Sequence, residues 1–452
     1  MNEPIISVSG LRGIVGQSLT PEITIRYVAA FAESLPTGPV VVTRDGRHTG
    51  PMLAEAVRAA LLASGRSSLD AGIAATPTTG VLVRHQGAAG GIQISASHNP
   101  SEYNGLKLLD STGRVIPAEA GQQVIDRYRE EAPQWKSFDQ LGASRTIEDS
   151  TTAHLAMVVG ICDVERIRGK RFRVFLDANN GSGSVLGIPL LEELGCEVTV
   201  LGADADGQFG HPPEPTSENL KSVLQLVEAS GANIGFCQDP DADRLAVVDE
   251  TGRYVGEEYT LAMCVDHVLR HGSLGQGPGA VVTNCSTSRM TRDLAEKYSV
   301  PFHRSKVGEA HVVDQMLAEE ATFGGEGNGG VIDPRVGYVR DSFVGMALLL
   351  DAMAAREQPI STLADELPRY AMHKMKVNLA ADIVPTALDA LEKHFAGATP
   401  DRLDGLRLDW PNKWLLVRVS NTEPIVRVFA EAPTADEARD TCNVAANVLN
   451  SF

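Results

Sequence analysis

The chain has 452 residues and a formal net charge of −18 at pH 7. At roughly 150 residues per domain, this length predicts about three domains, with two to four left open. Hydrophobic residues make up 43% of the chain and charged residues 22%, which is typical of a globular protein that buries its cores. The negative charge argues against binding to nucleic acids or to anionic membranes, because both need a basic face. A small anionic substrate remains open if its site concentrates cations locally.

The first 150 residues alternate apolar strands with amphipathic helices. Thr20 and Pro21 suit the N-cap and the first turn of a helix. Residues 39–43 (PVVVT) read as a buried strand, and residues 51–64 read as a helix that ends at a glycine. This alternation predicts a parallel sheet with crossover helices.

The same pattern begins again twice further along the chain. Residues 173–177 (RVFLD) start a second α/β unit, and a third starts near Glu257. The last ~80 residues differ, because their strand-like runs are grouped rather than alternating with helices, which favours an α+β unit. We therefore expect four units, at residues 1–150, 151–254, 255–368 and 369–452.

The features that bear on location point to the cytoplasm. The N-terminal stretch MNEPIISVSG has neither a charged region nor a long apolar run, so it does not resemble a secretory signal. No apolar run approaches the ~20 residues of a membrane helix. The six cysteines form no CxxC pair, and several stand in apolar runs, as reduced core cysteines do. The oligomeric state is not readable from the sequence.

The strongest local signal is the run DPDADR at residues 239–244, directly after the apolar strand ANIGFC. Alternate residues of an extended backbone project to one side, so Asp239, Asp241 and Asp243 converge. Without a cation the three carboxylates would repel one another. Oxygen-only ligands favour Mg²⁺, Ca²⁺ or Mn²⁺ over zinc, and Arg244 adds a fixed positive charge. The alternative is a solvated acidic loop.

A second signal is the segment 91–108, GIQISASHNPSEYNGLKL, in which an apolar strand runs into small polar residues. A serine in such a loop is a nucleophile if a neighbour activates it, and His98 and Lys107 are close in sequence. The residue types alone do not rank Ser95, Ser97 and Ser101, and a plain turn fits them equally well.

A third signal is the glycine-dense run GGEGNGG at residues 324–330. Glycines let the backbone approach a ligand closely, while the side chains of Glu326 and Asn328 form hydrogen bonds to it. A carboxylate suits sugar hydroxyls because it only accepts hydrogen bonds. The alternative is a flexible linker.

The fourth signal is the run RVSNTEP at residues 418–424, with Arg427 close behind it. The run lies between two apolar strands. Arginine, hydroxyl and amide donors on one tight turn make an anion site, and arginine grips phosphate with two parallel hydrogen bonds. The alternative is an ordinary β-turn.

Together and in this order, the four motifs resemble the α-D-phosphohexomutase superfamily, which includes phosphoglucomutases, phosphomannomutases and phosphoglucosamine mutases. The resemblance covers essentially the whole chain, and further runs support it: SGLRG near the N-terminus, RDGR at 44–47, ATPTTG and PEPTSENL. It implies three related α/β domains with mixed sheets and a smaller C-terminal α+β domain, all around a central cleft. It also implies interconversion of hexose 6-phosphates and hexose 1-phosphates through a phosphoserine and a sugar 1,6-bisphosphate, which serves as activator.

The resemblance assigns roles by position. It implies one Mg²⁺ per site, with Ser97, as phosphoserine, and the three aspartates as ligands. The residues implied in catalysis are Ser97, Arg12, His98, Lys107 and Arg244, with the proton-transfer group left open between His98 and Lys107. The residues implied in sugar binding are Glu326, Asn328, Lys306, Gly308 and Glu309, and those implied in phosphate binding are Arg418, Ser420, Asn421, Thr422 and Arg427.

Two departures bear on the substrate. Many bacterial relatives read GExSGH where this chain reads GEGNGG, so Asn328 replaces a serine and Gly330 a histidine. The run KVGE ending at Glu309 resembles phosphoglucosamine mutases, and an acid there suits an ammonium group at C2. PEPTSENL favours phosphomannomutase-like members instead. We expect glucosamine phosphate, with mannose or glucose phosphate as the alternative.

Two other functions on the same fold are less well supported. A sugar-bisphosphate phosphatase or synthase would share the serine and the aspartates, but the complete fourth loop favours a mutase that retains its bisphosphate. A non-enzymatic sugar-phosphate sensor predicts damage to the serine or the aspartates, and the sequence has none.

Overall fold

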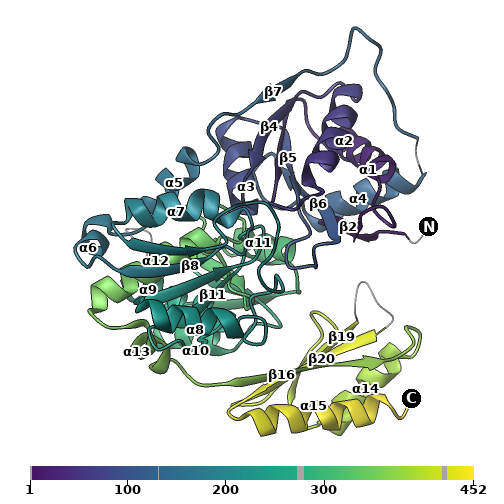
Figure 1. Ribbon diagram of the computed structural model, residues 1–452. Coiled ribbons are helices and arrows are strands. Elements are labelled where there is room, and N and C mark those ends of the chain that lie inside the picture. The colour runs from purple at the N-terminus through teal and green to yellow at the C-terminus, as the bar shows by residue number, and fades with distance from the viewer. Residues whose placement is uncertain (1–2, 131, 272–278, 420–424) are drawn as a thin grey trace.

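The computed structural model describes residues 3–130, 132–271, 279–419 and 425–452. Within these residues the strands form four sheets (Figure 1). The first three are mixed and flanked by helices, whereas the C-terminal sheet is antiparallel. The fold expected from the sequence is therefore confirmed. Among the described helices, none combines the length and the apolar character needed to cross a bilayer.

The first sheet has seven strands: β1 (Ile5–Ser7), β2 (Gly10–Ile14), β3 (Val40–Arg44), β4 (Ser68–Ile73), β5 (Gly90–Ile94), β6 (Tyr103–Asp110) and β7 (Ser144–Thr146). Their order is β1-β2-β6-β5-β3-β4-β7. Strand β3 pairs in parallel with β4 and β5, but β6 and β2 run antiparallel, so the prediction of a parallel sheet holds for only part of it. The helices of this unit are α1 (Pro21–Ser34), α2 (Gly50–Ala63), α3 (Thr76–His85) and α4 (Ala118–Glu130).

The second and third sheets repeat one plan, in which three parallel strands end in an antiparallel edge strand. The second has the order β11-β10-β8-β9 and the third β13-β12-β14-β15. Their strands are β8 (Arg173–Asp177), β9 (Glu197–Leu201), β10 (Ile234–Gln238), β11 (Leu245–Asp249), β12 (Val281–Asn284), β13 (Phe302–Ser305), β14 (Phe323–Glu326) and β15 (Gly330–Ile332). Their helices are α5 (Thr152–Val159), α6 (Val164–Arg168), α7 (Gly183–Glu193), α8 (Lys221–Ser230), α9 (Glu257–His271), α10 (Met290–Lys297), α11 (Glu309–Ala318), α12 (Ser342–Arg356) and α13 (Ile360–Asp365).

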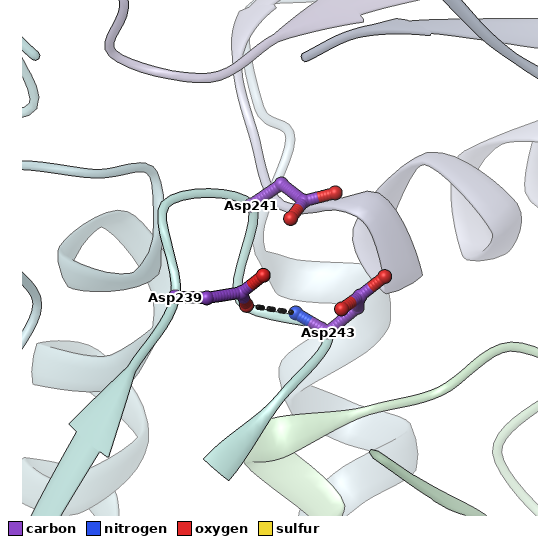
Figure 2. A group of neighbouring side chains, drawn as sticks. All are labelled: Asp239, Asp241 and Asp243. Carbon is purple, nitrogen blue, oxygen red and sulfur yellow. Dashed lines mark hydrogen bonds between the residues drawn. The ribbon is translucent and has the colours of Figure 1, made fainter. Parts of the chain in front are cut away.

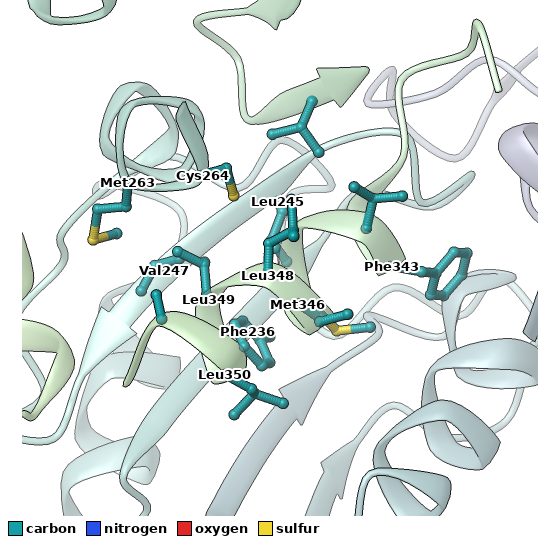
Figure 3. Close-up of a cluster of buried hydrophobic side chains, with 14 of the residues drawn as sticks. Phe236, Leu245, Val247, Met263, Cys264, Phe343, Met346, Leu348, Leu349 and Leu350 are labelled. Carbon is teal, nitrogen blue, oxygen red and sulfur yellow. The ribbon is translucent and has the colours of Figure 1, made fainter. Parts of the chain in front are cut away.

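One hydrophobic core joins the second and third units (Figure 3). Phe236 and Leu245 from the second sheet pack with Cys264 of α9 and Phe343 of α12. Helix α12 is apolar on nearly all sides, as a helix between two layers must be. Because burial of apolar surface stabilises both units at once, their relative position is fixed by the core itself.

A buried polar contact connects the first three units. His154 of α5 is fully buried, and its Nε2 lies 2.7 Å from Asp341 Oδ2 while its Nδ1 lies 2.9 Å from Thr78 Oγ1 of α3. The other oxygen of Asp341 caps α12 by accepting from the backbone N–H of Phe343 and of Val344. The start of α12 is therefore held in register with α3 and α5.

The C-terminal unit is a five-stranded antiparallel sheet in the order β16-β20-β19-β18-β17, with two helices packed on one face (Figure 1). Its elements are β16 (Ala371–Asn378), α14 (Val384–His394), β17 (Thr399–Asp401), β18 (Leu406–Asp409), β19 (Trp414–Val419), β20 (Ile425–Ala432) and α15 (Ala435–Leu449). It has a core of its own. The opposite face of the sheet is therefore free of its own helices.

Candidate active site

The three aspartates lie on the turn between β10 and β11 (Figure 2). Asp239, Asp241 and Asp243 are fully buried, and one oxygen from each lies within 4.8 Å of the others. Ala242 has a φ of 53°, which gives the turn its left-handed kink. The sequence prediction that the three carboxylates converge is borne out by this geometry.

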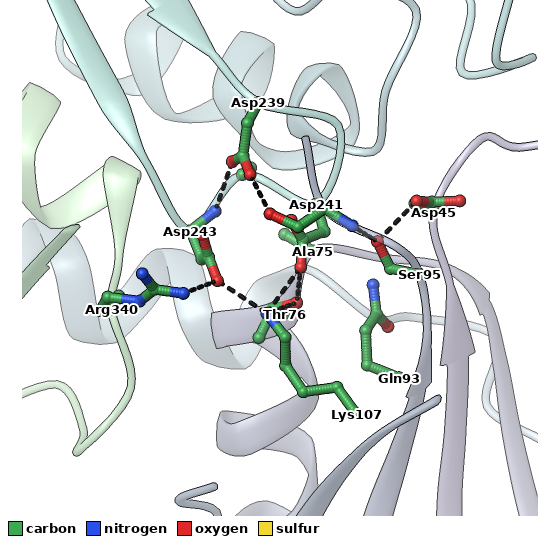
Figure 4. A network of polar contacts seen from close by, with 12 residues as sticks. Asp45, Ala75, Thr76, Gln93, Ser95, Lys107, Asp239, Asp241, Asp243 and Arg340 are labelled. Atoms are coloured by element: carbon green, nitrogen blue, oxygen red, sulfur yellow. Dashed lines mark hydrogen bonds and ion pairs between the residues drawn. The ribbon is translucent and has the colours of Figure 1, made fainter. Parts of the chain in front are cut away.

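The Oδ2 atoms of Asp241 and Asp243 form ion pairs with cationic side chains (Figure 4). Lys107 Nζ donates to Asp241 Oδ2 at 2.8 Å and to Asp243 Oδ2 at 2.7 Å. Asp241 Oδ2 also accepts from Thr76, and Asp243 Oδ2 accepts from Arg340 Nη2 at 2.6 Å. The Oδ1 atoms of Asp241 and Asp243 are buried without a hydrogen-bond partner. Carboxylate oxygens in that state fit a hard divalent cation, so this group can bind a metal ion.

The pKa values of Asp239 and Asp241 are shifted in opposite directions. Burial and the two neighbouring carboxylates raise the pKa of Asp239 well above its usual range. Burial also acts to raise the pKa of Asp241, but Lys107 outweighs it, and the pKa of Asp241 falls below its usual value. A cation among the three would relieve the repulsion felt by Asp239.

Ser97 lies in the loop between β5 and β6, 1% exposed and with a φ of 49°. Its Oγ donates to Asp239 Oδ2 at 2.6 Å and lies 3.3 Å from His98 Nδ1. The structure also distinguishes the three serines. Ser95 Oγ is committed to Asp45 and to the Ser97 N–H, and Ser101 is exposed.

The loop that carries Ser97 is held by Arg47, whose role sequence analysis missed. This side chain is 1% exposed, and its guanidinium donates to four backbone carbonyls, those of Ser97, Asn99, Pro100 and Tyr103. Its Nε forms an ion pair with Asp45 Oδ2 at 3.1 Å. Because one rigid fork holds four carbonyls, the loop has little freedom to shift. The RDGR run was a signal, but it carried no indication of this role.

Two further arginines, Arg12 and Arg244, lie close to His98. Arg12 Nη1 donates to Asn99 Oδ1 at 3.3 Å, and Arg244 Nη1 lies 3.6 Å from Glu214 Oε1. The positive charge of Arg244, followed by burial, holds the pKa of His98 well below its usual value. Burial acts to lower the pKa of Lys107, but Asp241 and Asp243 outweigh it and raise that pKa. His98 is therefore neutral near pH 7, and Lys107 is charged.

Glu326 ends β14 and is 6% exposed. Its Oε1 accepts from Asn284 Nδ2 at 2.8 Å and from the Gly308 N–H at 3.1 Å. Its Oε2 accepts from Arg340 Nη1 at 2.8 Å and, more weakly, from Asn328 Nδ2 at 3.4 Å. The carboxylate is thus fixed in one orientation, and this contradicts the alternative of a flexible linker.

Glu309, expected to meet the sugar, is occupied by another partner. Its Oε1 accepts from the backbone N–H of Arg340 at 3.0 Å and its Oε2 from Arg340 Nε at 3.2 Å. Lys306 is exposed and is not among the residues that line the cleft. The structure therefore brings Gly308 and Glu309 to the site but not Lys306.

Two residues of the predicted phosphate site, Arg418 and Arg427, line the cleft from the C-terminal sheet. Arg418 of β19 and Arg427 of β20 are direct cross-strand partners, and Lys376 of β16 pairs with Arg427 in turn. Arg418 Nε also donates to Asp404 Oδ2 at 2.9 Å. Like charges placed directly opposite one another repel, and an anion bound between them would reduce that repulsion. Ser420, Asn421 and Thr422 lie outside the described residues.

All four units contribute to one cleft of about 530 Å³. Ser97 and the aspartates are not in its lining, but they contact His98, Lys107 and Arg340, which are. A larger hollow of about 880 Å³ on the first unit contains none of the predicted site residues. The predicted residues that line the cleft are Arg12, His98, Lys107, Arg244, Gly308, Glu309, Glu326, Asn328, Arg418 and Arg427.

Four domain families match the chain in sequence order. They are phosphoglucomutase/phosphomannomutase alpha/beta/alpha domain I at residues 5–135, domain II at 152–252, domain III at 257–370 and the C-terminal domain at 374–448. A phosphoglucomutase/phosphomannomutase of Thermococcus kodakarensis is 37% identical over 449 residues, covering 97% of each chain. The chain belongs to the α-D-phosphohexomutase superfamily.

Other similarities agree with this assignment. A probable phosphoglucosamine mutase of Methanopyrus kandleri is 34% identical, covering 96% of this phosphohexomutase and 94% of the relative. The crystal structure of a putative phosphomannomutase from Thermus thermophilus superposes with a TM-score of 0.85 at 25% identity, over the full length of both chains. The protein is therefore an isomerase, a phosphohexomutase of carbohydrate metabolism.

Proposed function

We propose that this phosphohexomutase interconverts glucosamine 6-phosphate and glucosamine 1-phosphate, with Ser97 as the residue that carries the phosphoryl group. The observation that carries the proposal is the contact between Ser97 Oγ and Asp239 Oδ2 at 2.6 Å, directly beside His98, which lines the same cleft as the pair Arg418 and Arg427. A nucleophile and a separate phosphate-binding site are the two parts that an enzyme needs to transfer a phosphoryl group to and from a sugar monophosphate.

In the proposed reaction, the bond between phosphorus and Ser97 Oγ breaks as a bond forms between phosphorus and the free sugar hydroxyl. The hydroxyl proton passes to a base of the site, and a sugar 1,6-bisphosphate results. After the bisphosphate turns round, a bond forms between Ser97 Oγ and the other phosphorus as the bond from that phosphorus to the sugar oxygen breaks. The freed sugar oxygen takes the proton from the base, and the opposite monophosphate leaves. Arg418 and Arg427 hold whichever phosphate is not reacting.

Mg²⁺ is the cation that best fits the acidic trio, and Asp239, Asp241, Asp243 and the phosphorylated Ser97 would hold it. When bound, it would offset the negative charge that shifts between oxygens during transfer. Lys107 keeps Asp241 and Asp243 turned so that one oxygen of each remains available. A phosphoryl group on Ser97 Oγ would replace the hydrogen bond that this hydroxyl now donates to Asp239.

His98 is the group that we assign to proton transfer. Its Nδ1 lies 3.3 Å from Ser97 Oγ, within reach of the oxygen at which the phosphoryl group leaves and returns. Lys107 is held by two carboxylates and stays protonated, which suits it to stabilise charge rather than to act as a base.

The choice of an amino sugar rests on Glu257, which lines the cleft and whose Oε1 is buried without a hydrogen-bond partner. An ammonium group at C2 of the sugar would supply a donor to that oxygen. The relative with 34% identity is also named a probable phosphoglucosamine mutase. The alternative is a neutral hexose phosphate, as in a phosphoglucomutase/phosphomannomutase, and the relative with 37% identity has that name.

The function is tested by ³¹P NMR of the protein with Mg²⁺ and a trace of the matching 1,6-bisphosphate. Glucosamine, mannose and glucose 6-phosphates are compared in parallel. The proposal predicts a growing 1-phosphate signal, fastest with glucosamine. Faster conversion of mannose or glucose would keep the mutase but reject the amino sugar, whereas release of inorganic phosphate alone would identify a phosphatase.

Removing the metal should stop phosphoryl transfer without abolishing sugar-phosphate binding. We expect a chelator to lower turnover by at least about 10³-fold, because the three aspartates repel a phosphoryl group unless a cation lies between them and it. Sugar-phosphate binding, followed by calorimetry, should persist, since Arg418 and Arg427 lie on the C-terminal unit and not among the aspartates. Restored turnover on adding Mg²⁺ completes the test, and unchanged turnover in the chelator would reject the metal assignment.

A further inference from the structure

One buried arginine links loops from two different units. Arg340 is 7% exposed and lies just before α12, in the third unit. Its three guanidinium nitrogens donate to three different carboxylates. Nη2 donates to Asp243 Oδ2 at 2.6 Å, Nη1 to Glu326 Oε2 at 2.8 Å and Nε to Glu309 Oε2 at 3.2 Å.

These carboxylates belong to different parts of the proposed reaction. Asp243 is on the metal loop of the second unit. Its other oxygen, Oδ1, accepts no hydrogen bond and lies 3.9 Å from Arg244 Nε. Glu326 ends the strand that leads into the sugar loop. The planar fork of an arginine fixes all three at once, and a lysine has no equivalent geometry.

The sugar loop leaves space for this side chain. Gly330 starts β15 with an ordinary backbone conformation, but a Cβ at that position would lie 2.4 Å from Arg340 Cδ and 2.8 Å from its Cγ. A residue with a side chain at 330 and an arginine at 340 in this position therefore exclude each other. This is the position at which the sequence departs from its GExSGH relatives.

We propose that Arg340 is a positioning residue that couples the metal site to the sugar site. It orients Asp243 so that its free oxygen faces the metal position, and the same guanidinium orients Glu326 for the sugar hydroxyls. Metal affinity and sugar recognition therefore change together when Arg340 is altered. The inference rests on the metal assignment of the proposed function.

The test compares R340K with the matched control R335K. Arg335 lies in the same segment and forms a two-pronged ion pair with Asp333, but it is not in the lining of the cleft. Mn²⁺ affinity is measured directly by electron paramagnetic resonance titration, and KM is measured for the hexose 6-phosphate that the wild type converts fastest. In R340K we expect the Kd for Mn²⁺ and the KM each to rise at least about tenfold. R335K should leave both within about twofold.

The outcomes distinguish a failure of this coupling from a failure of the metal assignment on which it rests. A change in only one of the two quantities in folded R340K, or in neither, would overturn the coupling and leave the mutase assignment in place. If Mn²⁺ binds wild type and D241N equally well, the metal assignment fails and the coupling fails with it.

Gly330 provides a second route if R340K does not fold. G330A adds a methyl group against the stem of Arg340, so we expect the Kd for Mn²⁺ to rise about tenfold although residue 330 is not on the metal loop. G397A is the control, because a Cβ at Gly397 meets nothing within 4 Å. A folded G330A protein that binds Mn²⁺ as tightly as the wild type would contradict the role of Arg340.

Discussion

Replacing Ser97 with alanine should lower mutase turnover by at least about 10³-fold, while the protein stays folded. The hydroxyl is the only part of the side chain that reacts, and its loss leaves no oxygen to carry the phosphoryl group. The backbone at Ser97 has a φ of 49°, which alanine tolerates no worse than serine. The hydrogen bond to the buried Asp239 is lost, so we expect the free energy of unfolding to fall by about 1–3 kcal/mol. Turnover is followed by ³¹P NMR and folding by circular dichroism.

Ser101→Ala is the control, since Ser101 stands in the same loop with an exposed side chain. It should keep full turnover. Incubation with a radiolabelled sugar 1,6-bisphosphate adds a readout that does not depend on turnover, because wild type and S101A should retain label on the protein and S97A should not. More than about a tenth of wild-type turnover in S97A would reject the phosphoserine assignment.

The regular elements were predictable wherever local pattern and chain direction agree. The strand at residues 173–177 and the start of the helix at Thr20 and Pro21 lie where the sequence placed them, because each has a clear apolar pattern or a clear start signal. The antiparallel pairing of β2, β6 and β5 was not predicted. A strand's direction in its sheet depends on partners far away in sequence, and apolar periodicity carries no information on it.

The residues of the site were likewise only partly predictable from the sequence. The aspartates could be predicted to converge because two-residue spacing alone places them on one side of the chain. Arg340 could not, because its three partners come from positions 14, 31 and 97 residues away. The sequence also could not show that Glu309 is paired with Arg340. A residue type indicates which groups a side chain is able to bind, but not which neighbour it contacts in the fold.

Arg47→Met should both destabilise the protein and slow the reaction. The substitution leaves Asp45 fully buried without its ion pair and removes the donor from four carbonyls. Breaking a buried pair from one side costs about 3–5 kcal/mol, so we expect the free energy of unfolding to fall by that amount. Turnover should fall about 100-fold even in the folded fraction, because small displacements of a reacting group have effects of that size. Denaturant titration and ³¹P NMR measure the two effects.

Arg58→Met is the matched control for the loss of an arginine and its ion pair. Arg58 lies in the same unit and pairs with Asp70 at 3.0 Å, but its side chain is 28% exposed. A partly exposed pair contributes about 1 kcal/mol or less, so R58M should change stability little and turnover not at all. If R47M unfolds at the same denaturant concentration as R58M, the carbonyls around Ser97 are satisfied without Arg47. If R47M is destabilised but keeps full turnover when folded, the arginine supports the fold alone, and the position of Ser97 is fixed by Ser95 and the aspartates.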